Sequence, residues 1–184
     1  MAFGGMMETD TSKSARQVSE ANRDGLPGTG VNPKLIANSI LRRAFKEQIA
    51  VSPMKLQRLM FLITCLYQRT TGCRLLTESF QPWKYGLVCG TVYGAFESFG
   101  GNPITEYAKD AIGNVYAADE GSSPELRQAT DTVWSHLGCL SAVTLSRITV
   151  LLGSAWSKAV EGKSYFVSNA DMAEDHTFDA CLKT

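Results

Sequence analysis

The sequence predicts a predominantly α-helical α+β fold: a compact single-domain helical bundle with a small β hairpin or short strand pair. Apolar residues recur at helical spacing over most of the chain. Three of these runs begin with a side chain that can cap a helix, followed by proline, at Asn32, Ser52 and Ser123. The stretch 75–85 breaks the pattern with Pro82 and three aromatic residues, which favours an extended or hairpin segment.

Composition and length indicate one folded domain with two flanking segments. The chain has 184 residues, of which 44% are hydrophobic and 20% charged, enough for one sizeable core and short for two. Residues 1–31 are rich in small polar residues and lack apolar periodicity, which is typical of a flexible tail. We therefore expect an N-terminal tail at 1–31, a folded domain at 32–160 and a C-terminal extension at 161–184.

Two longer helices are expected at the start of the domain, at 33–48 and 53–72. The second begins after Ser52 and ends at a glycine, a common helix terminator. Its apolar positions include Leu59 and Ile63, which we expect to be buried at the centre of the core.

Shorter elements follow the hairpin segment. Apolar spacing predicts a third helix that ends at two consecutive glycines, and three further helices at 124–137, 142–152 and 154–160. The stretch 104–118 is ambiguous, and a short strand pair around Gly113 is one option. The third helix is marked by Val88, Val92, Ala95, Phe96 and Phe99.

Cysteine usage and hydropathy point to a cytoplasmic protein. The five cysteines are odd in number and form no C-x-x-C pair, which indicates a reducing compartment rather than a disulfide framework. No apolar stretch near the N-terminus suggests secretion. The longest apolar run, 59–67, is far shorter than the roughly 20 residues that span a bilayer.

The residue types that catalysis requires do not occur in recognisable patterns, so we expect no enzyme, no cofactor and no metal site. His136 and Cys139 could place two ligands on one helical turn, but no second ligand pair follows at a convincing spacing. Cys89 could act as a nucleophile only if the fold brought His136 to it. The polar group around Asp175 is expected to be a surface turn.

Charge is uneven although its sum is zero. Residues 34–74 contain eight Lys or Arg residues and one acidic residue, Glu47, whereas acidic residues outnumber basic ones near the C-terminal end of the chain. The eight cations are Lys34, Arg42, Arg43, Lys46, Lys55, Arg58, Arg69 and Arg74. This segment is a candidate basic surface for an acidic partner protein, an RNA or the chain's own acidic end, and a solvated helix face is the alternative.

An aromatic cluster accompanies the basic segment. Phe96 and Phe99 are expected to pack in the core. Trp83 and Tyr85 lie beside a glycine in a segment that connects two helices, and there they could either pack in the core or bind a partner. Aromatic residues beside cations also suit single-stranded nucleic acid, but zero net charge argues against it. The candidate partner-binding residues are Trp83, Tyr85, Tyr93, Arg42, Arg43 and Lys46.

The stretch 52–101 resembles the Panacea domain, the SocA-like antitoxin family, which also includes phage-associated proteins. This stretch contains counterparts of four family features: the S-P-x-K-L-Q helix start, the W-x-Y-G segment, the V-Y-x-x-F helix and the Gly-rich segment that follows it. A later piece, 140–156, resembles the closing helices of the family. Leu87 stands where the family usually has proline, so the local turn is expected to be less rigid. The counterparts are Ser52, Pro53, Lys55, Leu56, Gln57, Leu59, Met60, Trp83, Tyr85, Gly86, Val88, Val92, Tyr93, Phe96, Gly100 and Gly101.

The resemblance implies an antitoxin of a toxin–antitoxin system, of bacterial or prophage origin, that neutralises a cognate protein toxin by direct binding. It also implies a possible role as a proteolytic adaptor that presents the toxin to the ClpXP protease. The alternatives are an adaptor without a toxin partner and a nucleic-acid-binding regulatory protein.

Overall fold

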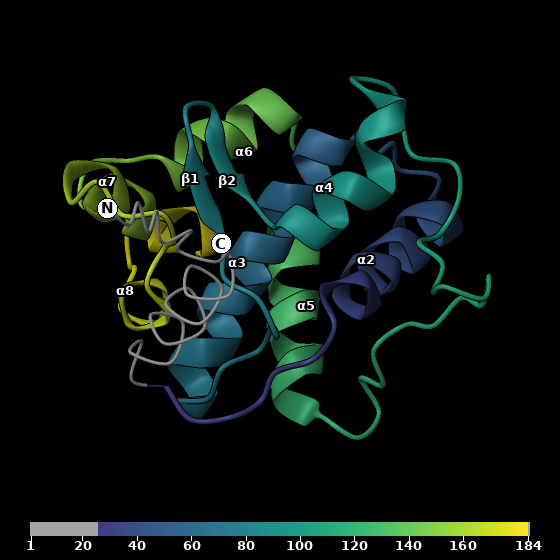
Figure 1. Cartoon of the computed structure of the whole chain (residues 1–184), viewed down its shortest axis with the longest axis horizontal. Helices are drawn as coiled ribbons and strands as arrows, with labels where there is room; N and C mark the ends of the chain where they lie inside the picture. The colour runs from purple at the N-terminus through teal and green to yellow at the C-terminus, as the bar shows by residue number, and fades with distance from the viewer. Residues whose placement is uncertain (1–25, 184) are drawn as a thin grey trace, which may run out of the picture.

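The computed structural model describes residues 26–183, which form a helical bundle around one central helix, α3 (Pro53–Thr71) (Figure 1). Helices α2 (Pro33–Glu47), α5 (Pro124–Leu137), α6 (Ala142–Thr149) and α8 (Asn169–Ala173) all pack against it. Within these residues, the small antiparallel sheet consists of two strands. The predominantly helical α+β fold that the sequence predicts is confirmed.

Local capping chemistry explains where the two longer helices begin. The side chain of Asn32 accepts a hydrogen bond from the backbone of Lys34 at 2.9 Å, and proline follows at the first helical position. Ser52 caps α3 in the same way, by accepting from the backbone of Lys55 at 3.4 Å. At the other end of α3, Gly72 adopts a left-handed conformation with φ of 65°.

Helix α3 supplies the centre of the core, as its apolar spacing predicts. The side chains of Leu59 and Ile63 are completely or almost completely buried. Phe61 packs edge-on against Phe80, with the ring centroids 5.5 Å apart. One continuous cluster of buried side chains therefore joins α3 to the helices around it and to the segment before the hairpin.

The hairpin consists of β1 (Gln81–Trp83) and β2 (Gly86–Val88), and its turn is formed by residues 84–85. Val88, expected to begin the third helix, instead ends β2, where it pairs with Gln81. Helix α4 (Gly90–Phe96) therefore begins later than its apolar spacing suggests, and a 3-10 turn, η1 (Glu97–Phe99), completes it.

The later elements differ from expectation mainly in their ends. Helix α6 stops at Thr149, because the chain must turn before Ser154 caps α7 (Ala155–Glu161). The expected strand pair around Gly113 is a single antiparallel bridge between Lys109 and Val115. The tail expected at 1–31 lies mostly outside the described residues, and Val31, at its end, donates a backbone hydrogen bond to Leu75 at 2.7 Å.

Residues after 161 pack back onto the bundle through α8 and η2 (Asp179–Leu182). Asp175, expected on a surface turn, is almost completely buried, because its carboxylate accepts a hydrogen bond from the backbone of Ala155 at the start of α7. Arg69 on α3 forms an ion pair with Asp179 at 2.9 Å. The basic segment thus meets the chain's own acidic end at this point. Among residues 26–183, no helix is long and apolar enough to cross a membrane.

Candidate partner-binding groove

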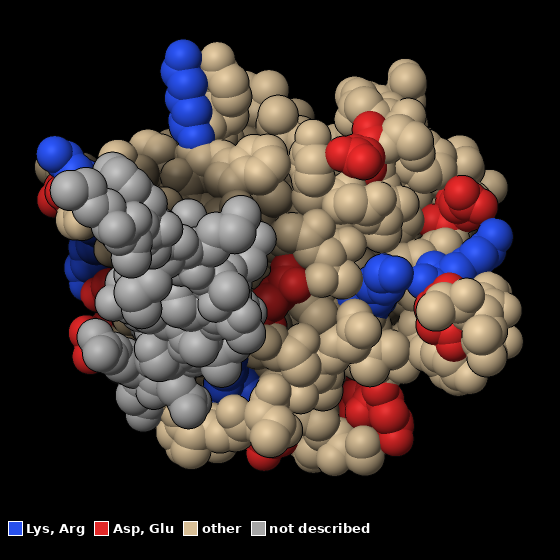
Figure 2. Space-filling model, in the orientation of Figure 1, with Lys and Arg blue, Asp and Glu red and all other residues tan. Residues whose placement is uncertain are grey.

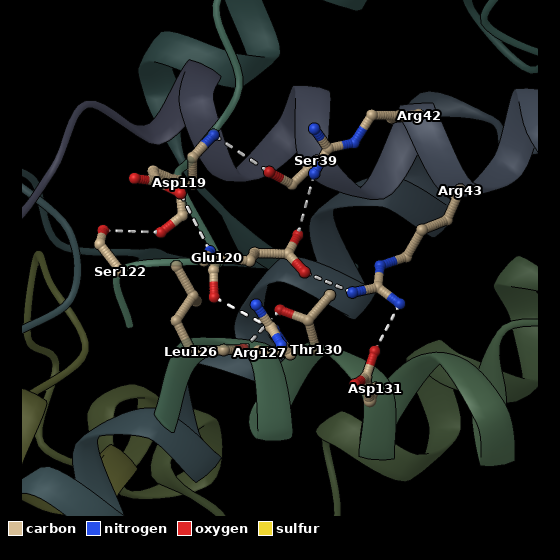
Figure 3. Close-up of polar contacts among 12 residues, drawn as sticks. Ser39, Arg42, Arg43, Asp119, Glu120, Ser122, Leu126, Arg127, Thr130 and Asp131 are labelled. Atoms are coloured by element: carbon tan, nitrogen blue, oxygen red, sulfur yellow. Dashed lines mark hydrogen bonds and ion pairs between the residues drawn. The ribbon is translucent and has the colours of Figure 1, made fainter. Parts of the chain in front are cut away.

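Several cations of the expected basic surface are buried or paired inside the molecule. Lys55 and Arg58 are buried. Arg43 forms ion pairs with Glu120 and, at 2.6 Å, with Asp131 (Figure 3). Although desolvation lowers the pKa of Arg43, its hydrogen bonds and charge interactions with these two carboxylates raise it above its ordinary value.

The contacts of Arg43 hold the segment before α5 against α2. Glu120 is almost completely buried between the two helices, and its backbone carbonyl accepts a hydrogen bond from Arg127 at 3.2 Å (Figure 3). Arg42 remains more than half exposed, 3.6 Å from the carboxylate of Glu120. Lys46 is exposed and does not line the groove described below. None of the three α2 cations is among the residues that line that groove.

The aromatic cluster divides into a buried and an exposed part. Phe96 is buried in the core and Phe99 packs against it, as expected. Trp83, Tyr85 and Tyr93 instead expose 43%, 73% and 40% of their surfaces. The rings of Trp83 and Tyr93 contact each other, with centroids 5.1 Å apart. Large aromatic side chains with this exposure are available to a partner.

Arg58, on α3, binds the backbone at and next to the hairpin turn. Its guanidinium donates hydrogen bonds to the backbone carbonyl of Tyr85 at 2.5 Å, to that of Leu87, and to the hydroxyl of Ser146 at 3.0 Å. Burial lowers the pKa of Arg58 to about 10, so the side chain is still protonated at neutral pH. One buried cation therefore connects α3, the hairpin and α6.

Gly86 makes this arrangement possible. Its φ is 121°, which side chains of L-residues rarely adopt, and a Cβ at this position would lie 2.3 Å from the Arg58 guanidinium. Glycine therefore suits this position for two reasons: the positive φ of the backbone and the close approach of the Arg58 side chain. Leu87, which follows it, is completely buried in β2.

Gln57 and Glu78 hold the exit of the hairpin. The Gln57 amide bonds both backbone groups of Cys89, at 2.8 and 3.1 Å. Glu78 accepts hydrogen bonds from the Cys89 thiol at 2.8 Å and from the backbone of Thr91 at 2.9 Å. Desolvation and the Glu78 carboxylate raise the pKa of Cys89 well above its ordinary value. The raised pKa keeps the thiol protonated at neutral pH, and a protonated thiol is a poor nucleophile.

These contacts shape a depression of about 570 Å³ between the hairpin, α3 and α4. Its walls are mostly apolar or aromatic, and Met54, which the sequence analysis did not single out, exposes 43% of its surface there. Figure 2 shows that the surface over the hairpin and α4 carries few charged side chains compared with the α2 side of this face. The residues that line it include Pro53, Met54, Gln57, Arg58, Trp83, Lys84, Tyr85, Val88, Tyr93 and Glu97. We call this depression the α4 groove.

The candidate metal ligands His136 and Cys139 belong to no metal-ligand cluster among the described residues. Among residues 26–183, no three histidine, cysteine, aspartate or glutamate side chains gather as metal ligands. The Nδ1 atom of His136 lies 2.8 Å from the carbonyl of Thr132 on its own helix, and Cys139 is exposed. This surface offers an apolar, aromatic contact area on a hairpin that is hydrogen-bonded to α3, which suits binding of another molecule.

Comparison with known proteins gives two matches. A family model described as "Antitoxin SocA-like, Panacea domain" matches residues 56–157, more than half of the chain. Antitoxin SocA from Caulobacter vibrioides (strain NA1000 / CB15N) is 24% identical over 135 residues, covering 72% of each chain. No solved structure shows significant similarity.

Proposed function

Because the chain belongs to the SocA-like antitoxin family defined by the Panacea domain, we propose that it is an antitoxin that binds a cognate protein toxin at the α4 groove. We place the binding site at this groove because Trp83, Tyr85 and Tyr93 are exposed around one apolar depression. Tryptophan and tyrosine are enriched among the residues that dominate binding energy at protein interfaces.

The rigidity of the groove supports this proposal. Arg58 and Gln57 hold the hairpin from α3, and the indole of Trp156 donates a hydrogen bond to the carbonyl of Trp83 at 3.1 Å. Binding to a hairpin whose backbone is already held in place costs less conformational entropy. A dissociation constant of about 1 nM corresponds to roughly 12 kcal/mol, enough for neutralisation by mass action.

The test is co-expression of the chain with the product of the adjacent gene. We expect the neighbour to be toxic alone, to be harmless with this chain, and to co-purify with it. Tyr85→Ala should weaken the complex by about 30-fold or more, the effect of losing about 2 kcal/mol at an interface hot spot. Tyr165→Ala is the matched control, because Tyr165 exposes 84% of its surface and lies outside the groove.

The same experiment separates the possible mechanisms. Rescue at unchanged toxin level indicates masking of the toxin, whereas loss of toxin that requires ClpXP indicates delivery to that protease. A neighbour that is harmless and does not bind would refute the antitoxin proposal. Binding of RNA with steep salt dependence would instead support a nucleic-acid-binding role.

A further inference from the structure

A second apolar depression adjoins the α4 groove. It measures about 350 Å³ and lies between the hairpin turn, α6 and α7. The two depressions share Met54, Lys84 and Tyr85. The hairpin turn is therefore a ridge with an apolar hollow on each side. We call the second depression the α6 groove.

Apolar side chains line the α6 groove. Val143 exposes 58% of its surface, and Val150 and Trp156 complete the apolar lining. Contiguous exposed apolar surface of this kind marks an interaction site more often than an isolated exposed leucine does.

The charges around the ridge have one predominant sign. Lys84 and Arg147 form no ion pair with a carboxylate among the described residues, and Glu97 is the one acidic residue among those lining the two grooves. Arg58 donates to groups of this chain. Two exposed cations therefore remain to attract carboxylates from a partner.

A partner strand cannot simply extend the hairpin, because groups of this chain already occupy its outer edges. Arg58 and Gln57 bind backbone groups along β2 and just after it. Beside β1, the backbone of Val167 donates to Phe80 at 2.8 Å, and Trp156 donates to Trp83. Side chains that fill grooves, as on an amphipathic helix, remain the recognition mode that this surface fits.

We infer that the toxin presents an acidic amphipathic helix that crosses the Tyr85 ridge, fills both grooves with apolar side chains, and pairs carboxylates with Lys84 and Arg147. This inference rests on the proposed function and adds the second groove and the chemistry of the partner. The continuity of the two grooves, and the two exposed cations without carboxylate partners among the described residues, are the observations that carry it.

This inference can be tested by site-specific photo-crosslinking in the complex of this chain with the toxin encoded by the adjacent gene. The photoreactive residue p-benzoylphenylalanine replaces Tyr85, Val143 or, as a control outside both grooves, Ile112. We expect crosslinks from the first two positions to one toxin segment that contains aspartate or glutamate, and none from the control.

A charge-reversal variant provides the second measurement. Lys84→Glu with Arg147→Glu should weaken toxin binding at least tenfold, and the weakening should diminish at high salt. Lys163→Glu with Lys183→Glu makes the same change in net charge outside both grooves and should have little effect.

The outcomes distinguish the two proposals. Crosslinks from position 85 without any from 143, or unchanged affinity after charge reversal, would overturn this inference and leave the α4 groove as the binding site. A stable complex without crosslinks from either position would overturn both locations. If the neighbouring protein is not a toxin, the proposed function fails, and this inference fails with it.

Discussion

Replacing Arg58 with methionine tests whether one buried cation holds the binding surface together. Methionine keeps much of the side-chain volume but has no donors. The carbonyl of Leu87 would then be left buried without its partner, at a cost of about 1 to 3 kcal/mol. The carbonyl of Tyr85 is only partly buried, so water can replace part of its lost bond. We expect Arg58→Met to lower the free energy of unfolding by about 2 to 4 kcal/mol in total.

Urea denaturation followed by tryptophan fluorescence measures this loss. With a slope of about 2 kcal/mol per molar urea, the midpoint should fall by about 1 to 2 M. The matched control is Arg147→Met, because Arg147 is exposed and should change stability by no more than about 0.5 kcal/mol. A loss under about 1 kcal/mol for Arg58→Met would refute the reasoning, since it would mean that the hairpin carbonyls find other partners.

Three further predictions concern the core, the thiols and the acidic end. Leu59→Ala, at a completely buried position, should cost about 2 to 5 kcal/mol in urea denaturation; a loss well below 1 kcal/mol would show that α3 is not central. In the native protein Cys65 and Cys89, both buried, should resist a thiol reagent at pH 8 that labels all five cysteines after unfolding; rapid native labelling of five would contradict their burial. Desolvation raises the pKa of Asp179, but hydrogen bonds with His176 and Arg69 outweigh it and leave the pKa below the ordinary 3.8. A carboxylate whose pKa is lowered by folding stabilises the fold at pH values above its ordinary pKa, and this stabilisation is lost as pH falls through its folded pKa. The stability lost in Asp179→Asn should therefore be smaller in acid than at neutral pH. A loss that is the same at pH 7 and pH 3 would count against the ion pair.

The sequence by itself determined where the two longer helices begin, since caps act over very short distances. Ser52 needs only the backbone three residues ahead, and Asn32 that two residues ahead, so both helix starts could be read directly. The burial of Leu59 followed from helical spacing for the same reason. The exposed aromatic residues were also singled out, because their types and the adjacent glycine pointed to a connection.

Only the tertiary structure decided which charges are free. Arg58 and Arg147 are both arginines on helices, yet Arg58 is buried because the hairpin carbonyls about thirty residues later lie over it. Arg43 is paired through carboxylates on a distant segment, and Asp175 is buried against the start of α7. Spacing along one helix cannot reveal such partners, because the burial of a charge depends on groups that reach it from elsewhere in the chain. The two grooves exist for the same reason: their walls come from the hairpin, α3, α4, α6 and α7, which meet only in the folded protein.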